Sequence, residues 1–118
     1  MKLTEFGRFI RKYRIDKSIF LKDMADKLGV TSAFLSAIET GNKPIPLDIE
    51  EKILSYFEMT PQEKSDLLNA VDATRTHVSI KVSNNKLEQQ LVGAFRRQLN
   101  TLDNEKKKAI LKILKGEH

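Results

Sequence analysis

Apolar residues in the first 74 positions recur at helical spacing in five consecutive segments. In the first segment Leu3, Phe6, Ile10 and Tyr13 are three or four residues apart, which is typical of one buried face of a helix. The later segments repeat this spacing, and their apolar positions are Leu21, Met24, Ala25, Leu28, Leu35, Ile38, Ile49, Ile53, Phe57, Leu67, Leu68 and Val71. The pattern predicts a mainly α-helical domain at residues 1–74, in which five helices share one core.

Capping residues mark the ends of several of these helices. Gly29 and Gly41 are expected just past helix ends, because glycine readily adopts the left-handed backbone that closes a last turn. Thr31 is expected to cap the third helix, and Ser18 is the nearest residue that can cap the second. The run Thr60-Pro61-Gln62-Glu63 combines a threonine cap, a proline in the first turn and a glutamate three residues after the cap. It is the strongest helix start in the chain.

The pattern changes after Thr74. Residues 77–82, with the sequence HVSIKV, alternate with period two, so we predict a short strand there, with an extended linker as the alternative. A single strand needs a partner for its backbone, and the same strand of a second copy is the natural candidate. Apolar stripes then predict helices at about 86–100 and 103–115. Residues 75–118 are therefore interpreted as a dimerisation or partner-binding tail, whose expected dimer contacts are Val78, Ile80, Val82, Leu87, Leu91 and Phe95.

Composition narrows the class of protein. The chain has 40% hydrophobic residues and 31% charged residues, which is compatible with a folded core. It has no cysteine, so disulfides, thiolate metal sites and a cysteine nucleophile are excluded, and a cytoplasmic location is expected. No apolar run approaches the ~20 residues that span a bilayer, and the first residues contain no signal-peptide apolar region. We expect no metal, no other cofactor and no membrane partner.

The charges are unevenly distributed along the chain. Residues 1–46 contain nine Lys or Arg against five Asp or Glu, and residues 75–118 contain ten against four. Residues 47–74 are acidic, with two basic residues against seven acidic ones. A polyanion is therefore attracted to the first and last parts of the chain and repelled by the middle. Solvated helix faces with a chance charge bias are the alternative interpretation.

Residues 21–40 follow the pattern of a helix-turn-helix motif. Ala25 is small enough for two helices to approach closely, and Gly29 follows four residues later for the tight turn. The positions that flank the turn on the core side are all apolar, and they are Met24, Leu28, Val30, Leu35 and Ile38. In such a motif the second helix is free to enter the major groove of DNA.

The run Leu28–Gly41, with the sequence LGVTSAFLSAIETG, resembles the turn and recognition helix of the Cro/C1-type, or XRE, family of helix-turn-helix DNA-binding proteins. The resemblance covers about residues 3–73 and implies a five-helix, lambda-repressor-like domain. It also implies an ion pair between Arg14 and Glu39 that holds the recognition helix against the first helix; two exposed, unpaired charges are the alternative. The resemblance, together with residue spacing, places nine residues at DNA. They are Lys22, Thr31, Ser32, Ala33, Phe34, Ser36, Ala37, Asn42 and Lys43.

Two features depart from the family pattern. The family usually has glutamine at the start of the second helix, after a polar cap, whereas here Leu21 follows Phe20. Lys22 can replace the phosphate contact that is lost. The recognition helix has no arginine, so bidentate readout of guanine from this helix is unavailable. Phe34 is expected either to pack on the sugar-phosphate backbone or to complete the core.

The resemblance implies a dimeric, sequence-specific regulator of transcription. We predict a repressor of its own operon, or of phage or mobile-element genes, that binds a palindromic site in double-stranded DNA. The alternative is an antitoxin, whose tail neutralises a toxin while the first domain represses transcription. We do not expect an enzyme, because neither His77 nor His118 lies in a catalytic motif.

Overall fold

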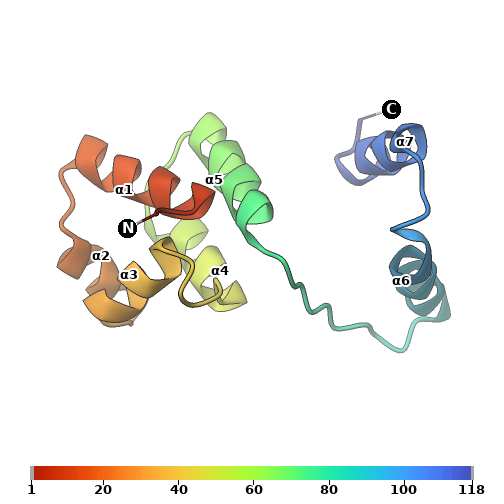
Figure 1. Cartoon of the computed structure of the whole chain (residues 1–118), viewed down its shortest axis with the longest axis horizontal. Coiled ribbons are helices and arrows are strands. Elements are labelled where there is room, and N and C mark those ends of the chain that lie inside the picture. Colours follow the sequence, from red (N-terminus) through yellow and green to blue (C-terminus); the bar gives the residue numbers. More distant parts are fainter. Residues whose placement is uncertain (1, 118) are drawn as a thin grey trace. The chain divides into compact units, whose positions relative to one another are not determined.

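The computed structural model describes residues 2–117, within which the chain is mainly α-helical, as predicted (Figure 1). His118 lies outside these residues. The chain separates into two compact units, one that ends at Val78 and one that begins at Ser79. The helices, in chain order, are α1 (Glu5–Lys17), α2 (Leu21–Leu28), α3 (Ser32–Glu39), α4 (Leu47–Tyr56), α5 (Pro61–Thr74), α6 (Lys86–Gln98) and α7 (Asn104–Leu114).

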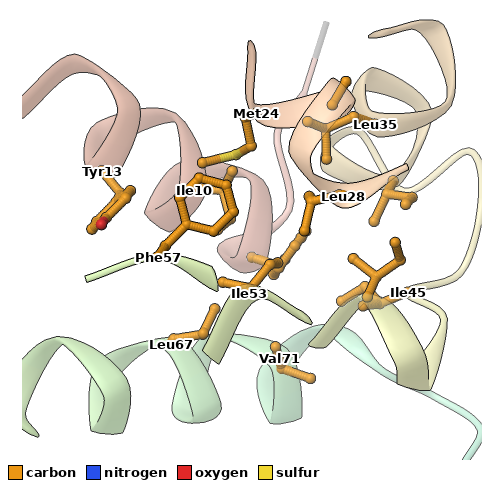
Figure 2. Packing of buried hydrophobic residues seen from close by; sticks show 14 residues of the cluster. Ile10, Tyr13, Met24, Leu28, Leu35, Ile45, Ile53, Phe57, Leu67 and Val71 are labelled. Atoms are coloured by element: carbon orange, nitrogen blue, oxygen red, sulfur yellow. The ribbon is translucent and has the colours of Figure 1, made fainter. Parts of the chain in front are cut away.

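The first unit has one hydrophobic core, to which each of its five helices contributes (Figure 2). Its buried apolar residues are Phe6, Ile10, Tyr13, Met24, Ala25, Leu28, Leu35, Ile38, Ile45, Ile49, Ile53, Phe57, Leu67 and Val71. The prediction for Leu68 is wrong: this side chain is exposed, since α5 turns only one face toward the core. Ile45 was not predicted because it lies in the loop between α3 and α4.

The expected capping residues occupy the helix ends predicted for them, except for Ser18. Thr60 and Glu63 form the predicted capping box at the start of α5, and Gly29 is left-handed at the end of α2. The prediction for Ser18 is wrong. Ser18 ends α1 in the left-handed region, with φ of 58°, and its backbone N–H is turned toward the last carbonyl groups of that helix. The residue that precedes α2 is Phe20, whose side chain forms no capping hydrogen bond.

The end of α5 is tied to the rest of the first unit by two polar side chains. The hydroxyl of Thr74 accepts a hydrogen bond of 3.1 Å from the backbone N–H of Phe6. The guanidinium of Arg75 donates to Glu50 at 2.6 Å and to the backbone carbonyl of Ile45 at 3.1 Å. Arg75 therefore holds the start of α4 and the loop before it against the end of α5.

The prediction of a strand at residues 77–82 is wrong. The described part of the chain contains no strand, and every residue from 77 to 82 is exposed without helix or strand structure. Period-two alternation is compatible with a strand, but it does not supply the second strand that backbone pairing requires. The extended linker, which was the alternative, fits this segment.

The second unit consists of two capped helices without a core. The side chain of Asn85 caps α6 and that of Asp103 caps α7, and neither helix contains a buried residue. Large apolar side chains are exposed on both helices, among them Leu87 with 73% of its surface accessible and Leu114 with 71%. No helix in the described residues is long and apolar enough to cross a membrane.

Candidate nucleic-acid interface

The segment with the predicted helix-turn-helix pattern forms two short helices, α2 and α3, joined by a tight turn. Gly29 has φ of 74°, a conformation that is strained for residues with a side chain, and the N–H of Val30 donates back to the carbonyl of Ala25 at 3.0 Å. Thr31 caps α3 as predicted, since its hydroxyl accepts a hydrogen bond of 3.0 Å from the N–H of Phe34. Local residues therefore fix both the end of α2 and the start of α3.

The last turn of α3 is attached to α1 through a buried ion pair. The two guanidinium nitrogens of Arg14 contact the two carboxylate oxygens of Glu39, Nη1 to Oε2 at 2.5 Å and Nη2 to Oε1 at 3.1 Å. Arg14 Nη1 also lies 3.6 Å from the sulfur of Met24. Because this geometry is bidentate and shielded from water, the pair fixes the orientation of α3 as well as its position.

The backbone of α3 is held against the start of α1 at the same place. The carbonyl oxygen of Glu39 accepts hydrogen bonds from both the N–H and the hydroxyl of Thr4, each at 3.0 Å. A Cβ atom added to Gly7 would lie 2.1 Å from this oxygen, so only glycine allows the two helices to come this close. Thr4 and Gly7 were not predicted to take part in this contact, although a glycine inside a helical pattern is a signal of close packing.

The opposite side of α3 presents small side chains to solvent. Thr31 and Ala33 are exposed, and Ser32, Ser36 and Ala37 are half-buried. Phe34 is also half-buried and packs against the core, which corresponds to one of its two expected roles. The only charged residue of α3 is Glu39, which Arg14 neutralises. The exposed face of α3 therefore carries hydroxyl and methyl groups without a charge.

The remaining predicted contact residues lie on both sides of α3. Asn42 and Lys43 are exposed in the loop that follows it, and the N–H of Lys43 donates to the carbonyl of Ala37 at 3.1 Å. This bond brings the loop back to the last turns of α3. Lys22 is exposed in the first turn of α2, where its ammonium group lies 3.2 Å from the carboxylate of Asp26. A phosphate contact by Lys22 requires that this exposed pair opens, which costs little.

The predicted dimer contacts are all exposed within the single chain. Val78, Ile80 and Val82 belong to the extended segment, and Leu87, Leu91 and Phe95 follow one face of α6. None of these six residues belongs to a hydrophobic cluster in the described part of the chain. The stripe on α6 is an apolar surface that another molecule can cover.

The resolved pKa shifts lie on α1 and α5, away from the exposed face of α3. Burial raises the pKa of Tyr13 above its usual value, with a further contribution from Glu63 and Glu58. A hydrogen bond from Thr60 lowers the pKa of Glu63. No group of three or more His, Asp or Glu residues that could hold a metal ion is present in residues 2–117.

Comparison with known proteins adds no relative. No protein-family model, curated protein or solved structure matches the chain. The geometry of α1, α2 and α3, with the chemistry of their exposed residues, is therefore the basis for assigning a function.

Proposed function

We propose that this protein is a sequence-specific DNA-binding regulator of transcription, whose first unit is a lambda-repressor-like helix-turn-helix domain of the Cro/C1 type. In this proposal α3 is the recognition helix and enters the major groove of DNA. The protein acts in the cytoplasm as a dimeric repressor of its own operon, or of phage or mobile-element genes.

The observation that carries the proposal is the contrast between the two sides of α3. One side is fixed to α1 by the Arg14–Glu39 pair and by the close contact at Gly7. The other side presents Ser32, Ser36 and neighbouring methyl groups, with no acidic side chain to repel phosphates. A rigidly held helix with a small, uncharged outer face can approach base edges closely, as groove binding requires.

The residue types on this face predict how DNA is recognised. Ser32 and Ser36 can exchange hydrogen bonds with several bases, and the methyl groups of Ala33 and Ala37 can contact the methyl group of thymine. The start of α3 also favours nearby phosphate, since the helix dipole places partial positive charge there. With no arginine on α3, sequence preference depends on thymine methyl groups and on DNA shape as well as on hydrogen bonds.

Dimerisation would raise the DNA affinity, which is expected to be low for the small side chains of a single α3 helix. Seven large apolar side chains are exposed along α6 and α7 and in the residues that end them, and they are Leu87, Leu91, Phe95, Leu99, Leu111, Ile113 and Leu114. At about 100 Å² each they offer on the order of 700 Å² per copy, close to the ~800 Å² per partner of a standard interface. A twofold dimer places two α3 helices about 34 Å apart on a palindromic site.

The test is a charge placed on α3, with a matched control on α5. Ser36→Glu sets a carboxylate against phosphates, and we expect at least a tenfold loss of affinity for the selected operator, or about 1.4 kcal/mol. Ser65→Glu makes the same change on the exposed side of α5, where the affinity should stay within about twofold of the wild type. Equal operator affinity of a folded Ser36→Glu protein and the wild type would contradict the placement of α3 in the groove.

The core-free tail supports a second candidate function, that of an antitoxin. In this alternative the apolar faces of α6 and α7, which lack buried residues, cover a toxin while the first unit regulates transcription. The two candidates are distinguished by co-expression with the product of the adjacent gene. A stable complex that requires Leu87 and Leu91 favours the antitoxin, and self-association without that product favours the dimeric repressor alone.

A further inference from the structure

Ion pairing is confined to the first unit of the chain. Among residues 2–117, every ion pair joins residues between Glu5 and Arg75. Within the described residues, no acidic side chain lies within 4 Å of the lysines of α7 and its end, which are Lys106, Lys107, Lys108, Lys112 and Lys115. The positive charge of this helix is therefore available to an external anion.

Three of these lysines form a stripe on one face of α7. Lys108, Lys112 and Lys115 are four and three residues apart, so their side chains project from the same side of the helix. At 1.5 Å per residue the stripe is about 10 Å long. This length corresponds to three intervals between successive phosphates on one strand of duplex DNA, at ~3.4 Å of helix axis each. Ile113 lies on the opposite face, with 66% of its surface exposed.

The helix dipole favours two of the stripe's lysines, whereas the spacing of Lys108 and Lys112 acts against the helix. Lys112 and Lys115 lie at the end of α7, where the helix dipole favours basic residues, and Glu105 is the acidic residue that the first turn favours. Lys108 and Lys112 are four residues apart, a spacing at which like charges repel. α7 has 11 residues and no buried side chain, so packing does not offset this repulsion. An external anion bound along the stripe would relieve the repulsion between Lys108 and Lys112.

We propose that the Lys108–Lys112–Lys115 stripe binds the phosphate backbone of duplex DNA beside the site that α3 reads. This role of the stripe rests on the proposed function, in which DNA is the bound anion. The contacts that the stripe makes do not depend on base sequence. The extended residues 76–84 can span about 30 Å, which allows the second unit to bind the same DNA molecule as α3. The stripe therefore raises affinity for every sequence equally and leaves the preference for the operator unchanged.

The experiment compares two triple variants of the full chain. K108Q/K112Q/K115Q removes the stripe, and glutamine preserves the helix because its helix propensity is close to that of lysine. K64Q/K81Q/K86Q removes the same total charge from α5, the linker and the start of α6, and serves as the control. Binding to operator and to random-sequence duplexes is measured between 50 and 300 mM NaCl, after circular dichroism has established equal helix content.

The expected result is a change in salt dependence that is specific to the stripe. Removing three phosphate contacts makes the negative slope of log Kobs against log salt shallower by about 2–3 for each bound chain. Affinity at low salt falls at least tenfold for both duplexes, and the ratio of operator to random affinity stays within about twofold. The control variant keeps the wild-type slope.

Three results would overturn the proposal. The first is an unchanged slope in the stripe variant, and the second is an equal loss in the control, which would indicate an effect of net charge alone. The third is an unchanged DNA slope together with stripe-dependent binding to vesicles of phosphatidylserine and phosphatidylcholine, which would assign the stripe to an anionic membrane surface. A Ser36→Glu protein that keeps operator affinity contradicts the proposed role of α3. The salt dependence of DNA affinity would still depend on the stripe in that case. Failure of the α3 role and failure of the stripe role are therefore distinguishable.

Discussion

The Arg14–Glu39 pair allows a quantitative test of how α3 is held. The side chains of Arg14 and Glu39 are 7% and 2% exposed, so removing either partner leaves the other charged group buried without a counterion. Breaking a buried pair in this way costs about 3–5 kcal/mol, compared with ~0–1 kcal/mol for an exposed pair. Because domains of this size have a free energy of unfolding of about 5–15 kcal/mol, we expect Arg14→Met and Glu39→Met each to lose a large part of it.

The double variant separates stability from positioning. Arg14→Met/Glu39→Met replaces the pair with apolar side chains, and such replacements are often neutral or stabilising by about 1–4 kcal/mol. We therefore expect the double variant to unfold near the wild-type urea midpoint, well above both single variants. Its operator affinity should nevertheless fall at least tenfold, since the directional bonds that orient α3 are gone.

The assay is urea unfolding followed by circular dichroism at pH 7, with operator binding measured on the same samples. The slope of the free energy of unfolding against urea must match among the four proteins, so that the midpoints report stability alone. Single-variant losses below about 1 kcal/mol would refute the argument, because the pair would then behave as an exposed one. A folded double variant with wild-type operator affinity would refute the positioning role.

Three further predictions concern packing, pH and assembly. Gly7→Ala places a methyl group 2.1 Å from the carbonyl oxygen of Glu39, so we expect a loss of about 1–3 kcal/mol in urea unfolding despite the better helix propensity of alanine. The hydrogen bond from Thr60 lowers the pKa of Glu63 below the usual 4.5, so its stabilising contribution is present above that pH and is lost as pH falls through the folded pKa. Glu63→Gln should therefore flatten the acid limb of a plot of stability against pH; a wild-type acid limb in this variant would contradict the assignment. Leu87→Glu/Leu91→Glu should convert a dimer into a folded monomer in sedimentation equilibrium, and a variant that stays dimeric would move the interface out of α6.

Local chemistry explains why helix positions were predictable from the sequence. Caps such as Thr31 and Thr60 act within three residues of their own position, so their effect is visible in a short stretch of sequence. The apolar spacing likewise identified most of the core, because helix faces follow directly from the period of 3.6 residues. The prediction that Ser18 caps α2 was wrong because a polar residue between two helices can end the first as well as begin the second.

Contacts between distant segments explain what the sequence could not predict. The hydrogen bonds between Thr4 and Glu39 join residues 35 positions apart, and the burial of Ile45 depends on how the loop before α4 folds onto the core. The strand prediction for residues 77–82 failed for a related reason, since a strand exists only with a pairing partner that a single sequence segment cannot provide. Residue patterns therefore defined the elements, whereas their close approaches required the structure.

Selection of bound duplexes from a random DNA pool tests most directly whether this protein reads DNA sequence through α3. We expect the full chain to enrich a palindromic site whose half-sites are about 10 base pairs apart, with thymine at the positions closest to Ala33 and Ala37. The folded Ser36→Glu protein should enrich no such site, while Ser65→Glu should enrich the wild-type sequence. A wild-type pool without any enriched sequence, or the same site recovered with Ser36→Glu, would contradict the assignment of α3 as the recognition helix.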